Sequence, residues 1–378
     1  MKILHTLDSL NRGGAEMLTL DVCRNATRAG FEVTFVATGG GDLEDEFCTS
    51  GAEFIRLDRR LPIDPFLVKS LRKIILDREI NIVHAQQAVE AIHLYLATRG
   101  TGVKCVMSLQ AYILDQKNRL ATKWIVPRMN RVCPVSAAMQ DWYRTGEGFT
   151  ITDRYRVLHN GVDPDRLQPT RDVNSRTLRA ELGIADNEFL MAMVGNFYPD
   201  RRKDQLTICR ALTTIFREVS NARFVFVGAA HAGAEDYFKE CKAVCSEAGI
   251  ESRVNFVGKR SDVVDILSEI DLFVFSSVQE GLPVAAIEAL MLGTPMVVSD
   301  IPPLLEVTRI AGSTEYCAAV FRTGDADDLS QTVLKLAKNP AELERLGELA
   351  ADETRRSFDI DAHLARLREI YDEMLQSQ

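Results

Sequence analysis

Short apolar runs alternate with longer amphipathic segments along the first 163 residues of the chain. Short runs rich in β-branched residues favour strands, and apolar residues repeated every three or four positions favour helices. Strands that alternate with helices are typical of βαβ units and of a parallel sheet. The pattern predicts strands at 2–7, 32–38, 81–85, 103–109 and 131–136, and helices at 16–29, 67–80, about 88–99 and from 137.

The same alternation starts again after a polar, irregular segment at 164–177 that has the character of a linker. The run 271–277 is almost continuously apolar, as expected for a strand that is buried on both faces. A chain of 378 residues also exceeds the roughly 250–300 residues at which one hydrophobic core stops growing. We therefore expect an α/β protein with two doubly wound domains. Further strands are predicted at 189–195, 222–228, 253–258 and 294–300, and helices at about 204–220, 235–248, 263–270, from 283, 327–352 and 359–375.

The chain carries a formal net charge of −9, which argues against a dedicated nucleic-acid-binding protein. The acidic excess falls in the second half, so the first half is better suited to an anionic partner, such as a membrane surface or a phosphorylated acceptor. No apolar run approaches the length of a spanning helix, and the start of the chain does not resemble a signal peptide. We expect a cytoplasmic protein and leave open a peripheral contact with the inner face of the membrane.

The eight cysteines are scattered, and none forms a C-x2-C pair. Cys241 and Cys245 lie one helical turn apart, but no histidines cluster beside them. This usage is typical of buried thiols in a reducing compartment. We therefore expect no metal site.

The stretch 276–300, SSVQEGLPVAAIEALMLGTPMVVSD, carries the most informative pattern in the chain. A buried strand ends at Ser277, a short loop follows, and a helix begins near Pro283. Ligands of open α/β sheets bind beyond the carboxyl ends of the strands, which places Glu280 and Gly281 at a binding crevice. Gly281 lets a ligand approach the backbone closely, and the free N–H groups at the start of the helix can hold a phosphate.

Two carboxylates so close to a phosphate site need a separate explanation. Glu280 and Glu288 would repel phosphates that they faced, but they are suitable acceptors for neutral hydroxyl groups. Glu280, in the loop, is placed to receive sugar hydroxyls, and Glu288, about two turns into the helix, is placed to receive the two hydroxyls of a ribose. The plainer alternative is a helix-terminal carboxylate and a solvated surface glutamate.

Glu280 and Glu288, with seven residues between them and followed by Gly293-Thr294-Pro295 and Val297-Val298, resemble the signature of the retaining glycosyltransferases of family 4. That family has the GT-B architecture, in which two Rossmann-like doubly wound domains face a deep cleft. The resemblance covers nearly the whole chain. Its weaker matches are Met1–Glu16 with Gly13-Gly14-Ala15-Glu16, Val135-Ser136, Asn160–Asp163, Val257-Gly258 and Asp271–Ser277.

The resemblance implies an acceptor-binding domain formed by residues 1–164 together with about 358–378, and a donor-binding domain formed by 165–357. It implies that Glu280 contacts the donor sugar and Glu288 the ribose. The donor would be a nucleotide sugar, most simply UDP- or GDP-linked, and no metal or other cofactor is expected. The backbone at Gly281, Leu282 and Pro283 would line the phosphate and sugar site, although Pro283 has no N–H to donate.

Transfer of a sugar places negative charge on the leaving phosphate, and fixed cations must stabilise that charge where no metal does. Relatives carry an arginine directly after a strand-terminal Val-Gly and a lysine about six residues later. This chain has Asn196 at the arginine position, and Lys203 lies one residue beyond the lysine position. We expect Lys203 and Arg202 to act on the diphosphate, with Arg201 as the alternative guanidinium, and Asn196 and Gly14 also at the donor site.

The glycine loop at 11–16 is expected between the first strand and the first helix, where its N–H groups could approach a donor phosphate or the acceptor. A tight strand-to-helix turn is the alternative. We place Arg12 and Gly13 on the acceptor side, with Arg12 guiding an anionic acceptor. Relatives often carry a histidine near the position of Gln110, which can hold a sugar hydroxyl but cannot act as a base. His84 is a further candidate on the acceptor side, and the family's front-face scheme, in which the leaving phosphate takes the acceptor proton, needs no protein base.

The segment 114–131 mixes basic residues with Leu120, Trp124 and Ile125, as expected for an amphipathic helix on an anionic membrane surface. Such a contact would suit a lipid-linked acceptor in polysaccharide or lipopolysaccharide synthesis, and a helix docked on its own domain is the alternative. A glycan or a small-molecule acceptor also stays open. One competing function is a GT-B enzyme of another class, such as an inverting transferase or a nucleotide-sugar epimerase. An inverting transferase needs a base beside the acceptor, and Gln110 disfavours that enzyme. The other competing function is a non-catalytic partner subunit, which Asn196 favours. The last helix, from about 358, is expected to return to the first domain.

Overall fold

The computed structural model describes residues 1–113, 115–168 and 177–376. The chain divides into two units, each built around its own sheet. Unit 1 comprises Met1–Asp163 with Phe358–Gln378, and unit 2 comprises Pro164–Ser357. Most of the predicted linker at 164–177 falls outside the described residues, and its first part, Pro164–Leu167, is a 3-10 turn.

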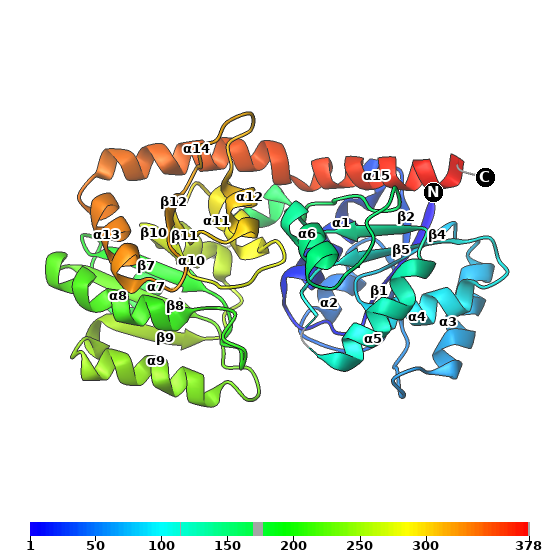
Figure 1. Cartoon of the computed structure of the whole chain (residues 1–378), viewed down its shortest axis with the longest axis horizontal. Helices are drawn as coiled ribbons and strands as arrows, with labels where there is room; N and C mark the ends of the chain where they lie inside the picture. Colours follow the sequence, from blue (N-terminus) through cyan, green and yellow to red (C-terminus); the bar gives the residue numbers. More distant parts are fainter. Residues whose placement is uncertain (114, 169–176, 377–378) are drawn as a thin grey trace. The chain divides into compact units, whose positions relative to one another are not determined.

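Unit 1 contains a six-stranded parallel sheet in the order β3-β2-β1-β4-β5-β6. This is the strand order of a Rossmann-like sheet, in which the order reverses between β1 and β4 and opens a ligand crevice at the carboxyl ends. Figure 1 labels β1, β2, β4 and β5 of this sheet. His5 pairs with His84 in the register of β1 and β4, so these two side chains lie on the same face. The strands are β1 (Lys2–Leu7), β2 (Glu32–Ala37), β3 (Glu53–Arg56), β4 (Ile82–Ala85), β5 (Lys104–Leu109) and β6 (Arg131–Pro134).

Helices cover both faces of this sheet because its strands are apolar on both sides. One face packs against α1, α2 and α15 in a core that includes Ile3 and Tyr371. The other face packs against α3, α4 and α5 in a core that includes Leu4 and Ile125. The helices are α1 (Gly14–Asn25), α2 (Glu44–Cys48), α3 (Pro65–Asp77), α4 (Ala88–Thr98), α5 (Gln116–Ile125), α6 (Ala137–Thr145) and α15 (Ile360–Gln376).

Unit 2 repeats the same plan in its own sheet, with the order β12-β11-β10-β7-β8-β9 and a reversal between β7 and β10. Its strands are β7 (Phe189–Val194), β8 (Ala222–Val227), β9 (Val254–Gly258), β10 (Leu272–Phe275), β11 (Met296–Ser299) and β12 (Ala319–Phe321). Its helices are α7 (Leu178–Leu182), α8 (Gln205–Glu218), α9 (Glu235–Glu247), α10 (Val263–Glu269), α11 (Val284–Met291), α12 (Pro302–Thr308), α13 (Ala326–Ala337) and α14 (Pro340–Phe358), which ends at the chain position where unit 1 resumes.

The predicted α/β class with two doubly wound halves is confirmed, but several local predictions were wrong. The edge strands β3 and β12 and the short helices α2, α7 and α12 were missed. The predicted helix at 327–352 is two helices, α13 and α14, because Pro340 begins a new helix and disfavours helical geometry at Asn339. Within the described residues, no helix is both long enough and apolar enough to cross a lipid bilayer.

Candidate active site

The central strand of unit 2, β10, delivers the residues of the predicted site to the carboxyl edge of its sheet. Its four residues are fully buried, and Ser276 and Ser277 continue it without exposure to solvent. The chain then crosses a short loop and enters α11 after Pro283, whose extended backbone (φ −75°, ψ 111°) ends the loop. Because β10 pairs with β7 where the strand order reverses, this loop lies at the crevice of unit 2.

A second segment runs alongside the end of β10 and brings Lys203 to the loop. The Val278 N–H donates to the Arg202 carbonyl at 2.9 Å, and the Asp204 N–H donates to the Ser276 carbonyl at 3.0 Å. The intervening residue, Lys203, therefore forms an antiparallel bridge with Ser277. The stem of its side chain passes Gly195, where an added Cβ would lie 3.4 Å from both Cδ and Cε of the lysine.

The ammonium group of Lys203 forms an ion pair with Glu280. Nζ lies 2.7 Å from Oε1 of Glu280, and the two side chains are only 12% and 10% exposed. Nζ also lies 4.1 Å from the ring centre of Phe275, and the Ser277 hydroxyl lies 2.6 Å from the same carboxylate oxygen. The pair thus combines an acceptor for hydroxyl groups with a cation that has three N–H donors.

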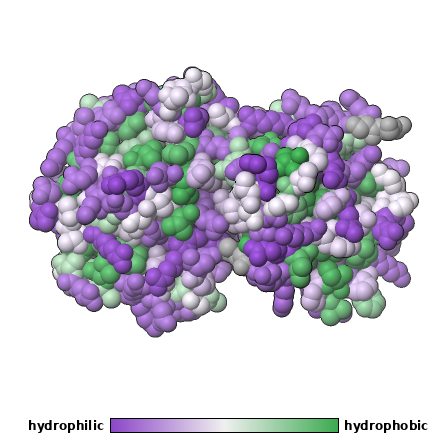
Figure 2. Space-filling view, viewed as in Figure 1, coloured by the Kyte–Doolittle hydropathy of each residue, from purple (hydrophilic) through white to green (hydrophobic). Residues whose placement is uncertain are grey.

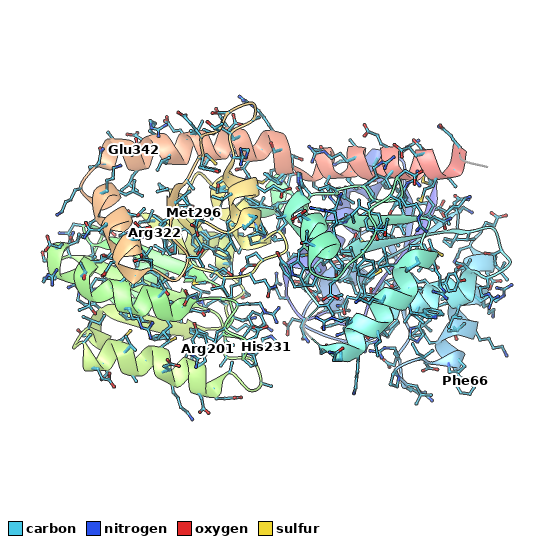
Figure 3. All side chains as sticks on the ribbon, in the orientation of Figure 1. Phe66, Arg201, His231, Met296, Arg322 and Glu342 are labelled. Atoms are coloured by element: carbon cyan, nitrogen blue, oxygen red, sulfur yellow. The ribbon has the colours of Figure 1, made fainter. Side chains whose placement is uncertain are left out.

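The two neighbouring arginines are held by other residues of unit 2. Arg201, which is labelled in Figure 3, has a left-handed backbone (φ 55°). Its guanidinium lies 2.7 Å from Glu240 and 4.8 Å from the ring centre of Tyr237, both on α9. Arg202 binds Asp200 at 2.8 Å and stacks 4.5 Å from the ring centre of Tyr198. Of these three adjacent side chains, only that of Lys203 forms an ion pair with a carboxylate of the loop after β10.

Asn196 binds the neighbouring backbone. Its Oδ1 accepts a hydrogen bond from the Ala229 N–H at 2.9 Å, which ties the end of β7 to the end of β8. The Gln205 amide nitrogen donates to the carbonyls of Gly195 and Asn196 at 3.3 and 3.2 Å. This network shapes the crevice of unit 2 without supplying a charge.

Glu288 forms a second nearly buried ion pair, with a residue that the sequence did not single out. Oε1 of Glu288 accepts a hydrogen bond from Arg166 at 2.7 Å, and the two side chains are 10% and 12% exposed. Arg166 lies in the turn Pro164–Leu167, more than a hundred residues before α11. A single basic residue in a polar segment gives no local signal that it will meet α11. Gly281, Leu282 and Pro283 lie between the two ion pairs along the chain, and Leu282 and Pro283 are buried.

In unit 1 the glycine loop leads into α1, but its own glutamate occupies the start of that helix. A Cβ on Gly13 would lie 2.6 Å from Oε2 of Glu16, and α1 begins at the next residue, Gly14. Burial raises the pKa of Glu16 to about 7. The guanidinium of Arg12, which we place on the acceptor side, forms an ion pair with Glu46 at 2.8 Å.

His84, which we predicted on the acceptor side, instead lies in the core of unit 1. It is buried, Nδ1 lies 2.6 Å from the Tyr371 hydroxyl, and Nε2 lies 2.8 Å from the Ser108 hydroxyl. Burial, with smaller contributions from two neighbouring histidines, holds its pKa well below the usual value. The alternation of β4 turns His84 toward the face that α15 covers, so both ring nitrogens are used inside the core.

The crevice of unit 1 instead presents polar residues that follow β1, β4 and β5. Asp8, directly after β1, accepts two hydrogen bonds from Arg59, at 2.6 and 3.1 Å. Gln110, after β5, donates to the Gln86 amide oxygen at 2.9 Å. Sequence reasoning singled out Gln110 but missed Asp8, Arg59 and Gln86, although each strand end could have indicated its own polar residue.

A buried carboxyl supports this edge. Glu90 in α4 accepts hydrogen bonds from the backbone N–H groups of Asp8 at 2.8 Å and Gln86 at 2.9 Å. Burial and the nearby charge of Asp8 raise the pKa of Glu90 to about 8, although these hydrogen bonds oppose the shift. Glu90 therefore joins the ends of β1 and β4 on either side of the reversal in strand order.

The two crevices offer different chemistry. Unit 2 combines carboxylate acceptors, a lysine and the start of α11, a set that suits a sugar, a ribose and a diphosphate. Unit 1 combines amides with an Asp–Arg pair, a set that suits hydroxyl groups. Within residues 1–113, 115–168 and 177–376, no three His, Cys, Asp or Glu side chains are grouped so that they could hold a metal ion.

Comparisons with known families agree with this division. A model of glycosyl transferases group 1 matches residues 174–353, and a model of glycosyltransferase family 4 matches residues 12–166. The chain belongs to the group 1 glycosyltransferases. This assignment makes the protein an enzyme that transfers sugars. The two models together match segments of both units.

Two relatives of this group 1 glycosyltransferase have names that state a substrate or a product. It is 22% identical to an Escherichia coli UDP-Gal:alpha-D-GlcNAc-diphosphoundecaprenol alpha-1,3-galactosyltransferase, over 99% of this chain and 97% of the relative. It is 25% identical to the capsular polysaccharide biosynthesis glycosyltransferase CapH of Staphylococcus aureus, over 76% and 78% of the two chains.

The fold of this group 1 glycosyltransferase is GT-B. The crystal structure of Anabaena HepE in complex with UDP and glucose matches it with a TM-score of 0.83 at 20% identity, over the whole of both chains. The predicted architecture is therefore confirmed. The roles of the individual site residues stay predictions.

Proposed function

We propose that this group 1 glycosyltransferase transfers a sugar from a UDP-linked donor to a glycan or lipid-linked acceptor, with retention of the anomeric configuration, in the synthesis of a cell-surface polysaccharide. One observation carries the proposal: Lys203 and Glu280 form a nearly buried ion pair at the carboxyl end of β10, directly before α11. The names of the E. coli and S. aureus relatives, and the UDP bound to HepE, support the donor and the product class.

In this proposal, the pair of Lys203 and Glu280 acts on both halves of the bond that breaks. Glu280 accepts hydroxyl hydrogens of the donor sugar, which orients the anomeric carbon. Lys203 keeps one N–H on Glu280 at 2.7 Å and turns its remaining donors to the diphosphate. As the bond between the anomeric carbon and the phosphate oxygen breaks, negative charge grows on that oxygen, and a fixed cation in a dry site stabilises it.

The acceptor proton goes to the leaving group in this scheme. The acceptor oxygen forms its bond to the anomeric carbon on the face that the phosphate leaves, and its proton passes to the phosphate oxygen. The anomeric configuration is therefore retained, and no side chain has to act as a base. Gln110, whose amide binds Gln86, is consistent with a role in holding a hydroxyl group.

We assign acceptor binding to the crevice of unit 1 and donor binding to unit 2. Asp8 and Arg59 form a half-buried pair at this crevice, with side chains 29% and 24% exposed. Together with Gln110 they can donate to and accept from the hydroxyl groups of a sugar. The assignment of donor binding to unit 2 rests on its two carboxylates and on Lys203.

Transfer without a metal ion is part of the proposal. The charge of Lys203 and the N-terminal end of α11 would stabilise the leaving diphosphate in its place. Turnover should therefore persist after exhaustive treatment with EDTA, and a loss that added Mg²⁺ or Mn²⁺ restored would contradict this part.

Peripheral membrane contact through unit 1 is also proposed. Two segments on the α3–α4–α5 face expose large apolar side chains: Phe66 is 78% exposed, Leu120 68% and Trp124 41%. Figure 2 shows hydrophobic surface along the edge of unit 1 to which these segments belong, and Figure 3 shows Phe66 at the outer edge of the unit. Exposed basic residues accompany them, as expected for an anionic lipid surface: Arg60, Lys69, Lys117 and Lys123.

The test is the anomeric configuration of the product, followed by proton NMR from the first turnovers with UDP-glucose or UDP-galactose as the donor. Retention from the first detectable product supports the proposal, and initial inversion would favour the inverting alternative. If neither transfer nor donor hydrolysis occurred with the wild-type protein, the non-catalytic alternative would stand. The Glu280→Gln variant should lose nearly all turnover while still binding UDP.

A further inference from the structure

Glu288 of α11 forms a deeply buried ion pair with Arg166. The guanidinium donates to Oε1 of Glu288 at 2.7 Å, and both side chains are close to nine-tenths buried. In the described part of the chain, Oε2 of Glu288 accepts no hydrogen bond that would hold it on the protein. One oxygen of the carboxylate is therefore fixed by Arg166, and the other is available to a ligand.

Such a pair needs a reason beyond stability. Removing two charges from water costs several kcal/mol per ion, and apolar residues of similar volume often stabilise a protein as well or better. The rest of α11 does use apolar residues, since Val284, Ile287, Leu290 and Met291 are buried. Glu288 is an exception on this helix, and the positive charge of Arg166 offsets part of the cost of burying its carboxylate.

The position of Glu288 points to the part of the ligand that it meets. It lies about one turn into α11, and side chains of a helix lean toward its N-terminus, so the carboxylate is directed back toward the crevice beyond β10. The diphosphate is assigned to Lys203 and the start of α11. A carboxylate one turn deeper would meet the next part of a nucleotide, which is the ribose.

We propose that Arg166 is a positioning residue, which fixes the rotamer and the charge of Glu288 so that Oε2 accepts from the ribose hydroxyl groups and the enzyme selects ribonucleotide over 2′-deoxyribonucleotide donors. This inference rests on the proposed function. A carboxylate that is built to accept two hydroxyl groups loses an interaction when one of them is absent, because the acceptor stays buried without a partner. The selectivity then depends on how firmly Arg166 holds the carboxylate.

The experiment measures the affinities of UDP and 2′-deoxy-UDP by isothermal titration calorimetry, and kcat and KM for the donor. The variants are Glu288→Gln, Arg166→Met and Arg166→Lys. Arg179→Met is a matched control, because Arg179 is also 12% exposed and lies 2.9 Å from a carboxylate, that of Asp271. Asp271 precedes β10 and so lies at the opposite edge of the sheet from Glu288.

The wild-type enzyme should prefer UDP over 2′-deoxy-UDP by about tenfold or more. Arg166→Met should weaken UDP binding by about tenfold, change 2′-deoxy-UDP binding by less than about threefold and raise KM more than it lowers kcat. Arg166→Lys should restore part of the preference, since the charge is kept and the planar fork is lost. Arg179→Met should lower the melting temperature and leave the preference unchanged.

The outcomes separate the inference from the function on which it rests. If Glu288→Gln kept the full preference for UDP, the assignment of Glu288 to the ribose would be wrong, and with it this part of the proposed function. If Glu288→Gln lost the preference but Arg166→Met kept it, the proposed function would stand and the positioning role would be refuted. Should Arg166→Met fail to fold, Arg166→Lys decides: an unchanged preference and an unchanged KM for the donor in that variant would overturn the role.

Discussion

Replacing Lys203 by methionine removes the cation that pairs with Glu280 and keeps most of the side-chain volume. In the native structure Nζ lies 2.7 Å from a carboxylate that is 10% exposed. Breaking a buried pair typically costs about 3–5 kcal/mol, because the remaining charge stays buried. The hydroxyl of Ser277, at 2.6 Å, still binds Glu280, so we expect the lower end of that range, about 3 kcal/mol.

The same variant should lower both the rate of transfer and the stability of unit 2. Lys203 is the charge that we assign to the leaving phosphate, and the loss of one preorganised donor typically lowers kcat by about 10²–10³. The free energy of unfolding should fall by about 3 kcal/mol, which corresponds to a decrease of roughly 6–12 °C in the melting temperature of a unit of this size. Both quantities can be measured on one preparation, by steady-state turnover and by thermal denaturation.

A double-mutant cycle separates the pair from its surroundings. Lys203→Met, Glu280→Gln and the double variant are compared, and the double variant should be destabilised by much less than the sum of the two singles. Lys239→Met is the control, because the pair of Lys239 with Asp236 is exposed (75% and 97%) and should contribute almost nothing. The reasoning would be refuted if the changes in the free energy of unfolding caused by Lys203→Met and Glu280→Gln were additive in the double variant. Turnover of Lys203→Met within threefold of the wild type would also refute it.

Three further predictions concern unit 1. Burial lowers the pKa of His5 and His363 to about 4, so the contribution of each histidine to the stability of unit 1 should fall by up to roughly 3 kcal/mol as the pH falls from 6.5 to 4, whereas the raised pKa values of Glu16 and Glu90 act in the opposite direction. Urea unfolding of the wild type and of His5→Leu at pH 7.5 and 4.5 isolates the histidine: the wild type should change by up to roughly 3 kcal/mol more in the destabilising direction, and an equal change in the two proteins would contradict this. The double variant Phe66→Ser with Trp124→Ser should co-sediment with phosphatidylglycerol vesicles about tenfold more weakly than the wild type, and its affinity for UDP should be unchanged. Equal co-sedimentation of the two proteins would show that this surface does not bind the membrane. Arg59→Met should raise KM for the acceptor about tenfold with little change in KM for the donor, as measured by steady-state kinetics. The reverse pattern would contradict the assignment of Arg59 to acceptor binding.

The repeating pattern of the sequence was sufficient to predict the architecture. Central strands such as β10 are apolar on both faces and bounded by turn residues, so their pattern is unambiguous. The edge strands are different: β3 is Glu-Phe-Ile-Arg with partly exposed side chains, and β12 has three residues. Short, half-exposed edge strands form because a neighbouring strand pairs with them, and this information is not local.

The site could be predicted only where one stretch of chain carries it. The loop after β10 and α11 fall within 25 consecutive residues, so their pattern indicated both carboxylates. The partners of those carboxylates come from distant segments: Arg166 precedes Glu288 by 122 positions. His84 was a candidate because it follows the apolar residues of a strand, toward the edge of the sheet where ligands bind, but its hydroxyl partner, Tyr371, lies 287 positions away. No local pattern contains such pairings, which depend on how the sheet is covered.

The most direct test of the central claim is a crystal structure of the enzyme with UDP. The account predicts the diphosphate at the start of α11 with an oxygen within hydrogen-bond distance of Lys203 Nζ, and the ribose hydroxyls on Glu288. UDP bound at another site, with the ion pair of Lys203 and Glu280 untouched and Glu288 out of reach of the ribose, would contradict it.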